Sequence, residues 1–114
     1  MFDKEQVGAL KSLYPKISTA SEGDFRFIRI DELKLPSGCA PDIVSALLCP
    51  MLRDNYPSRL FLSKKIAHKG RGQHWNADGV LILGQQWWGV SWKTTKPNQT
   101  LLEMVLDHLG AFRT

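Results

Sequence analysis

The spacing of apolar residues predicts a helix near the start of the chain, over residues 3–14. Three apolar side chains of this segment share one helical face: Val7, Leu10 and Tyr14. Asp3 can cap the helix, with Gln6 three residues later completing a capping box. Pro15 ends it. The polar segment 18–23 that follows predicts a loop.

A second helix is predicted over residues 100–112. Its apolar residues form one broad stripe: Leu101, Leu102, Val105, Leu106, Leu109 and Phe112. Thr100 and Glu103 fit a capping box. His108 lies off the main stripe, near the helix end, where the negative end of the helix dipole favours it without any functional role.

Strand patterns fill the region between the helices. Residues 24–35 alternate, with a change of parity that indicates a bulge or a strand buried on both faces. Residues 43–49 are nearly all apolar, which predicts a central strand. Residues 59–66 alternate again. The order of elements predicts a single α+β domain over residues 1–114, in which an antiparallel sheet of about four strands carries an N-terminal and a C-terminal helix.

Composition is that of an ordinary globular protein, with 43% hydrophobic and 23% charged residues in a chain of 114 and a net charge of +4. The sequence has no secretory signal pattern and no apolar run long enough for a membrane span, so we expect a cytoplasmic protein with reduced cysteines. Two cysteines and three histidines show no metal-ligand spacing, and we expect no metal or other cofactor.

Three stretches, in this order, resemble ubiquitin-conjugating (E2) enzymes and their RWD relatives. The first runs from Ala46-Leu47-Leu48-Cys49-Pro50 to Tyr56-Pro57, like the E2 strand that ends in proline before a Tyr-Pro turn. The second is residues 60–66, like the next E2 strand. The third is His74-Trp75-Asn76, then residues 79–83, Trp92 and a helix, which is similar to the His-Pro-Asn motif, the active-site segment and the helix of E2 enzymes.

The resemblance implies a ubiquitin-conjugating (UBC) or RWD-like fold in a divergent conjugation system, which we expect to be bacterial. It implies an E1-like adenylating enzyme and a ubiquitin-like protein as partners. The departures are specific: Trp75 replaces the proline, and Ile82 stands where the family has its catalytic cysteine. His68 is an alternative match to the family's histidine. The resemblance therefore favours an atypical or non-catalytic E2-like subunit, and the alternative is a non-enzymatic adaptor or regulatory module.

Three residues are candidates for catalysis if the chain is active. An E2 needs an accessible thiol, and Cys39 lies in a Gly/Pro turn, whereas Cys49 belongs to an apolar strand and reads as core. No base or helix N-terminus is evident beside Cys39, so the sequence favours a bystander loop cysteine over a reactive thiol. The resemblance implies that Asn76 donates a hydrogen bond to the oxyanion, and that His74 is the histidine of the same motif. Alternatively, Asn76 is a turn residue, because the sequence Asn-Ala-Asp-Gly is typical of turns.

Aromatic and basic residues are candidates for partner binding. Trp87 and Trp88 are adjacent, so on a strand they cannot both point inward, although packing in the core is the common role of such residues. We expect Trp75 and Arg71 to join them in a binding surface. The basic loop that contains Arg71 could also contact nucleic acid, which is the weaker alternative.

Overall fold

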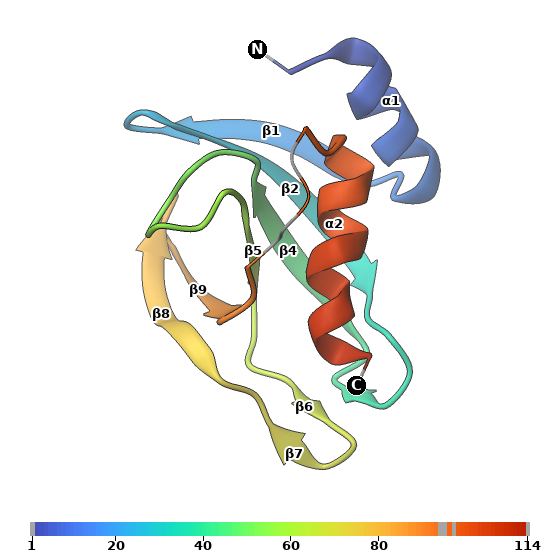
Figure 1. Cartoon of the computed structure of the whole chain (residues 1–114), viewed down its shortest axis with the longest axis vertical. Helices are drawn as coiled ribbons and strands as arrows, with labels where there is room; N and C mark the ends of the chain where they lie inside the picture. The colour runs from blue at the N-terminus through green and yellow to red at the C-terminus, as the bar shows by residue number, and fades with distance from the viewer. Residues whose placement is uncertain (1, 94–95, 97, 114) are drawn as a thin grey trace.

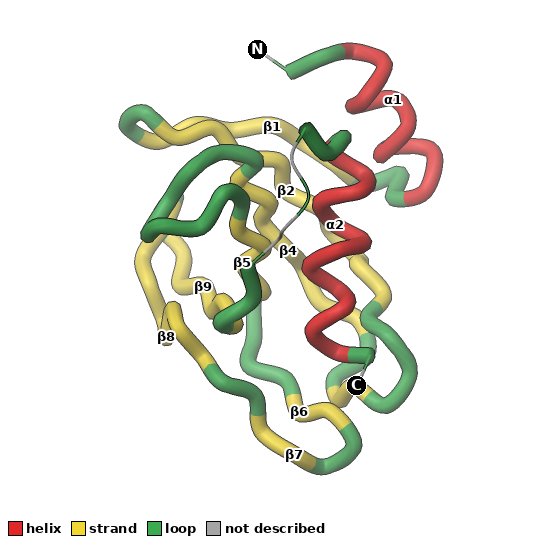
Figure 2. Tube along the Cα trace, in the orientation of Figure 1, coloured by secondary structure: helices red, strands yellow, loops and turns green. Residues whose placement is uncertain are grey.

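The computed structural model describes residues 2–93, 96 and 98–113. Its elements, in chain order, are α1 (Lys4–Leu13), β1 (Ile17–Glu22), β2 (Phe25–Lys34), β3 (Cys39–Ala40), β4 (Ile43–Cys49), β5 (Arg59–Leu62), β6 (Ala67–His68), β7 (Arg71–Gly72), β8 (Trp75–Ile82), β9 (Gln85–Val90), α2 (Leu101–Leu109) and the short 3-10 helix η1 (Gly110–Phe112). Figures 1 and 2 show a strongly bent sheet with α2 across it and α1 beside one end.

The predicted four-stranded sheet is wrong. The main sheet has six antiparallel strands in the order β1-β2-β4-β5-β9-β8, and a small second sheet joins β3, β6 and β7. Strands β2, β4 and β5 correspond to the three predicted strands, and β4 is central, as its apolar sequence predicted. The extra strands come from segments in which the sequence pattern predicted no strand.

Three of the extra strands, β1, β8 and β9, have physical reasons to escape prediction. Segment 18–23 is mostly polar because β1 is an edge strand that exposes most of its side chains. Strands β8 and β9 form a hairpin whose two-residue turn is Leu83-Gly84, with φ of 53° and 76°. Positive φ at both positions is the type I′ hairpin geometry, but Leu-Gly lacks the Asn or Asp that normally announces it.

One face of the sheet packs against both helices. Strands β2, β4 and β5 supply one alternating set of side chains, which meets Leu10 of α1 and Val105 of α2 in one buried cluster. The parity change predicted in 24–35 is a bulge between Ile30 and Leu33, where Glu32 adopts a φ of 57°. The bulge returns Leu33 to the helix-facing side, so a single long strand serves the same core along its length.

The opposite face is also buried, because the sheet curls. Its side chains on β2, β4 and β5 meet Ala77, Ile82 and Trp87 of the β8–β9 hairpin in a second cluster. The two edges of the sheet approach each other, since the backbone N–H of Leu83 donates to the Glu22 carboxylate at 2.9 Å. Figure 1 shows β8 and β9 bending away from the helices' side of the sheet. The strands therefore have a core on both faces.

Both predicted helices are confirmed, with one change in capping. Asp3 accepts from the backbone N–H groups of Glu5 and Gln6, and the capping box of Thr100 and Glu103 is present. The Gln6 side chain does not complete a box with Asp3. Its Oε1 instead accepts from the backbone N–H of Leu101 at 3.1 Å and joins the two helix starts.

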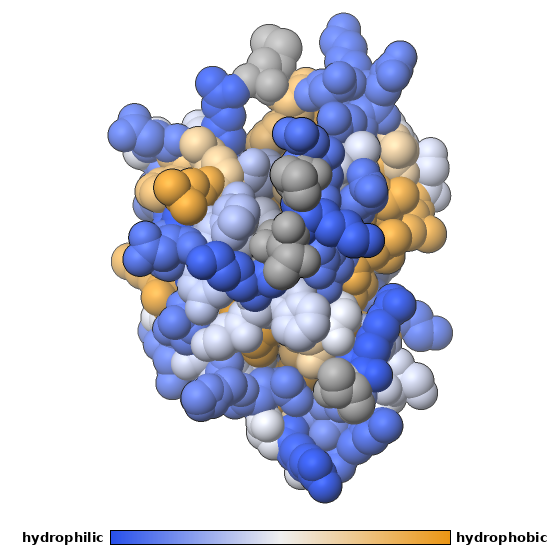
Figure 3. Space-filling view, in the orientation of Figure 1, coloured by the Kyte–Doolittle hydropathy of each residue, from blue (hydrophilic) through white to orange (hydrophobic). Residues whose placement is uncertain are grey.

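The surface is mixed in character. Figure 3 shows hydrophilic side chains over most of the face in view, with apolar ones gathered toward its margins. Within the described residues, neither α1 nor α2 combines the length and the apolar character that crossing a membrane requires.

Candidate functional site

Neither thiol of the chain is placed for attack on a partner. Cys39 is 8% exposed in β3 and Cys49 is fully buried in β4. Burial raises the pKa of both thiols, so the nucleophilic thiolate is disfavoured at neutral pH. Ile82, which stands where E2 enzymes carry their cysteine, is buried as well and ends strand β8.

The adjacent tryptophans point to opposite sides of β9, as neighbours on a strand must. Trp87 is 1% exposed, belongs to the second core cluster and donates its Nε1–H to the Ile82 carbonyl at 3.1 Å. Trp88 is half-buried and donates to the Asp78 carboxylate at 2.9 Å. Trp75 is half-buried against the helix-facing core. Trp87 is thus part of the core, and Trp88 and Trp75 keep some exposed surface.

The candidate residues of segment 68–76 are separated by the fold. His68 is buried in β6, and Arg71 is exposed in β7, at the lower end of the molecule in Figure 1. His74 is exposed, and its backbone carbonyl accepts from Ser91 at 3.0 Å. That bond brings the start of β8 beside the end of β9, where Asn76 reaches a surface pocket.

This Asn76 pocket is shallow, with a volume of about 340 Å³. Six residues from three segments line it: Asp54, Asn55, Tyr56, Asn76, Ser91 and Lys93. All but Asp54 present groups that can donate a hydrogen bond, and Lys93 adds a positive charge. Sequence reasoning found Asn76 but did not connect it to the turn at residues 53–56, because the two are brought together only by the curl of the sheet.

The turn at the pocket is rigid. The backbone N–H groups of Arg53 and Tyr56 each donate to the other residue's carbonyl, at 3.0 and 2.9 Å. Asp54 and Asn55 between them have φ of 54° and 68°. This is a type I′ turn, and Asp and Asn are the non-glycine residues that tolerate positive φ best. The sequence thus fixes the backbone on which Asp54 is presented.

Arg59 lies behind the pocket and is 2% exposed. Its Nη1 donates to the Asp54 carboxylate at 2.8 Å. Its guanidinium carbon is 4.4 Å from the centre of the Tyr56 ring and 5.0 Å from that of Phe61. Burial lowers the pKa of Arg59, and the Asp54 carboxylate opposes that shift. The Arg59 cation therefore lies against two pocket residues, Asp54 and Tyr56, and among the described residues Asp54 is its one direct carboxylate partner.

A second arginine enlarges this positive charge. Arg53 packs over Phe25, with 4.4 Å from its guanidinium carbon to the ring centre, and its Nε is 3.8 Å from the same Asp54 carboxylate. Within the described part of the chain, no group accepts a hydrogen bond from Arg53 Nε or from Arg59 Nη2, and both atoms are buried. One carboxylate thus faces two arginines, and the region keeps an excess of buried donors.

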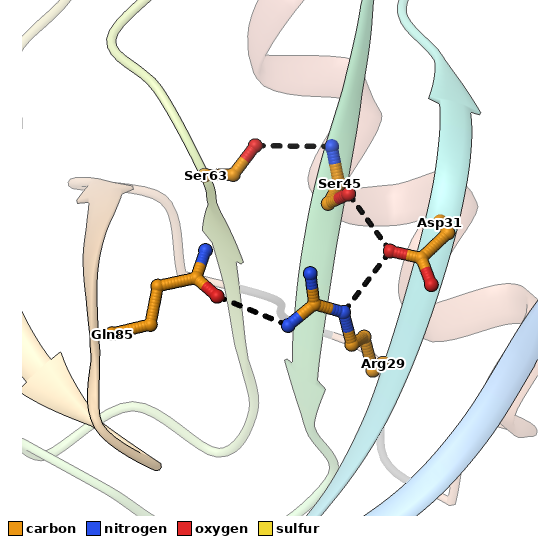
Figure 4. A network of polar contacts seen from close by, with 5 residues as sticks. All are labelled: Arg29, Asp31, Ser45, Ser63 and Gln85. Carbon is orange, nitrogen blue, oxygen red and sulfur yellow. Dashed lines mark hydrogen bonds and ion pairs between the residues drawn. The ribbon is translucent and has the colours of Figure 1, made fainter.

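A separate polar network crosses the opposite end of the curled face (Figure 4). Arg29 donates from Nε to Asp31 at 3.0 Å and from Nη1 to Gln85 at 3.1 Å. Ser45 donates from its hydroxyl to Asp31 at 2.8 Å and from its backbone N–H to Ser63 at 3.0 Å. The Ser45 hydroxyl, and then Arg29, lower the pKa of Asp31. Each charge here has partners, so the network links β2 to β9 without needing a ligand.

A buried Ser-His pair completes the polar groups of interest. The Ser58 Oγ and His108 Nε2 atoms are 2.9 Å apart, and the two residues are 2% and 4% exposed. Burial lowers the pKa of His108 to about 4, so the imidazole is neutral at pH 7. The expectation that His108 lies away from the core is wrong. The pair lies under α2, closed to a substrate, and acts as an internal hydrogen bond.

Comparisons with protein-family models, with curated proteins and with solved structures each gave no match to this chain. The arrangement of the site is therefore the basis for assigning a role. Among the features above, the Asn76 pocket alone combines exposed donors, a fixed backbone and surplus buried positive charge. Such an arrangement is suited to holding an anionic group by hydrogen bonds and charge.

Proposed function

We propose that the protein is a protein-binding module that holds a carboxylate of its partner in the Asn76 pocket. The observation that carries this proposal is the buried Arg59, whose Nη2 has no acceptor among the described residues behind a pocket lined by donors. Arg59 does not itself line the pocket, so a bound anion would not accept from Nη2. The anion would instead be attracted by the buried guanidinium charge, which reaches the pocket through Asp54 and Tyr56.

Charge supports an anionic rather than a neutral ligand. Lys93, Arg53 and Arg59 stand in or behind the pocket against the single carboxylate of Asp54. The Asn76 amide and the Ser91 and Tyr56 hydroxyls can donate to a carboxylate's two oxygens. The pocket fits one Asp or Glu side chain, or the C-terminus of a peptide.

A protein partner is favoured over nucleic acid. Nucleic-acid binding draws on several phosphate contacts along a groove. Here the exposed basic residues Lys69 and Arg71 lie at the tip of the β6–β7 hairpin, and neither lines the pocket. Figure 1 shows that hairpin at the end of the molecule away from the loop after β4.

The E2-like role stays a prediction with a specific difficulty. Thioester chemistry requires an accessible thiol, whereas Cys39 and Cys49 are buried and their pKa values are raised. The carboxylate-binding role proposed for the Asn76 pocket does not depend on a ubiquitin-like protein as the partner.

A peptide experiment tests the proposal. Random peptides with free C-termini are displayed and selected on the protein, and the affinity of the enriched sequence is measured by calorimetry. We expect enrichment of Asp, Glu or a free C-terminus, and about tenfold weaker binding by Lys93→Glu, which corresponds to about 1.4 kcal/mol. Lys64→Glu makes the same charge change at another exposed lysine. Equal weakening by both variants, or enriched peptides without an acidic group, would refute the pocket.

A further inference from the structure

The outer edge of β1 is open. In the sheet order, β1 and β8 are the two edge strands. Strand β8 carries the features that discourage pairing with another strand: its register shifts twice, and Gly79 has a φ of 75°. Strand β1 pairs with β2 in an unbroken register and contains no proline. Of the two edges, only β1 presents a regular template.

The register identifies which backbone groups of β1 are free. The Asp31 N–H donates to the Lys16 carbonyl at 2.9 Å, so Lys16 faces β2. In an antiparallel ladder, alternate residues face the same neighbour, and therefore Ser18, Ala20 and Glu22 also face β2. The N–H and C=O groups of the intervening residues point to the open edge: Ile17, Thr19 and Ser21.

Helix α1 leaves this edge accessible. A hollow of about 420 Å³ lies between α1 and β1, lined by Phe2, Val7, Thr19, Ala20, Ser21 and Arg26. Thr19 and Ser21 are exposed. Solvent therefore reaches the middle of β1 at these two residues.

We propose that two copies of this chain associate through β1, antiparallel about a two-fold axis at Thr19. This register pairs Thr19 with Thr19 of the second copy, and Ile17 with Ser21. All three outward-facing residues then exchange hydrogen bonds, roughly six in total. A shift by two residues in either direction leaves one outward-facing residue of each copy without a partner.

Charge selects the same register. With the axis at Thr19, Lys16 of one copy lies opposite Glu22 of the other, at both ends of the paired strands. Lys16 is exposed and also pairs with Glu32 at 2.8 Å, while Glu22 uses only Oε2 to accept from Leu83. A shift by two residues in one direction places Lys16 opposite Ala20 and Glu22 opposite Tyr14. The opposite shift places Glu22 opposite Ser18 and moves Lys16 to Asp24, in the turn beyond β1, so only the aligned register gives both Lys16 and Glu22 an opposite charge. Opposite charges across paired strands favour the aligned arrangement.

Disulfide trapping tests the register. In the proposed dimer the Cα atoms of the two Thr19 residues are about 5.5 Å apart, within the range that a disulfide spans. Thr19→Cys is therefore expected to give a covalent dimer under mild oxidation. Ser21→Cys is the matched control, because its two copies lie roughly 14 Å apart. The native cysteines are buried and do not compete. Equal cross-linking of both variants, or of neither, would overturn the proposal.

Sedimentation velocity over a concentration series tests association without a cross-link. The wild type is expected to shift from monomer to dimer as its concentration rises. Thr19→Pro removes an N–H that points away from β2, so it should keep the fold and abolish the shift. A wild type that stays monomeric at every concentration, or a folded Thr19→Pro that dimerises as well as the wild type, would contradict the proposal. The test is independent of the carboxylate pocket.

Discussion

Arg59 donates a hydrogen bond to Asp54 across 2.8 Å, although Arg59 is 2% exposed and the Asp54 side chain is 53% exposed. The pair therefore joins the interior of the curled sheet to the Asn76 pocket at its surface. A partner that binds at Asp54 and Asn76 would interact electrostatically with the buried Arg59 guanidinium, because the Asp54 carboxylate alone lies between the partner and that charge.

The cost of that arrangement can be measured. Asp54→Ala removes the direct acceptor of a buried guanidinium, and we expect a loss of about 1–3 kcal/mol in the free energy of unfolding. Urea denaturation gives the value. Asp42→Ala removes another exposed carboxylate, from a side chain with no hydrogen bond to the described residues, and should change stability by less than about 0.5 kcal/mol. Similar losses in both variants would mean that Asp54 does not support Arg59.

Gly89 allows Arg59 its position. A Cβ atom at Gly89 would lie 2.8 Å from Arg59 Nη2 and 3.2 Å from the Phe61 ring. We expect Gly89→Ala to lower the unfolding free energy by about 1–3 kcal/mol, the usual range for overpacking. Gly72→Ala is the control, since a Cβ there meets nothing within 4 Å. A Gly89→Ala variant as stable as the wild type would show that Arg59 moves freely.

Stability should fall in mild acid because of His108. Its pKa is about 4 in the folded protein and 6.5 when unfolded, so below pH 6.5 the unfolded chain takes up a proton that the folded chain does not. The loss grows as pH falls from 6.5 to about 4 and then levels off, at about 3 kcal/mol in total.

Chemical denaturation at several pH values measures this effect. His108→Gln can keep a hydrogen bond to Ser58 but does not titrate, so its stability should vary less between pH 6.5 and 4. If the stability of the variant and that of the wild type depend on pH in the same way, the buried imidazole is not the cause.

The two thiols should react slowly in the folded protein. Burial excludes reagents from Cys39 and Cys49 and raises the pKa of each thiol, which lowers the thiolate fraction. Labelling with a chromogenic disulfide is expected to be slow in buffer and fast in urea. Ser21→Cys places a thiol on the surface and should react fast in both. Fast labelling of Cys39 in buffer would restore it as a candidate nucleophile.

Local signals in the sequence predicted the parts of the fold that depend on local physics. The capped helices, the apolar central strand β4 and the bulge near Glu32 follow from periodicity and side-chain type. Strand β1 could not be predicted in this way, because an edge strand that exposes most of its side chains and has a polar sequence looks like a loop. The β8–β9 hairpin could not either, because Leu83 occupies a turn position where Asn is usual.

The candidate site was predictable only in part. The sequence shows both Asn76 and the turn at residues 53–56. The two lie close together only because the sheet curls and β9 and β8 come after β5 in the order of strands in the sheet. The burial of Arg59 was also hidden. The Arg59 side chain lies against Gly89 of the neighbouring strand, and the lack of a side chain at Gly89 leaves room for the guanidinium.

The most direct test of the account is a titration of the isotope-labelled protein with a Glu-rich peptide, followed by side-chain amide signals in NMR spectra. We expect the Asn76 amide signals to move with saturation, while those of Gln86, exposed on β9, stay in place. Asn76 signals that stay unchanged, or that move no more than those of Gln86, would contradict a carboxylate site at the Asn76 pocket.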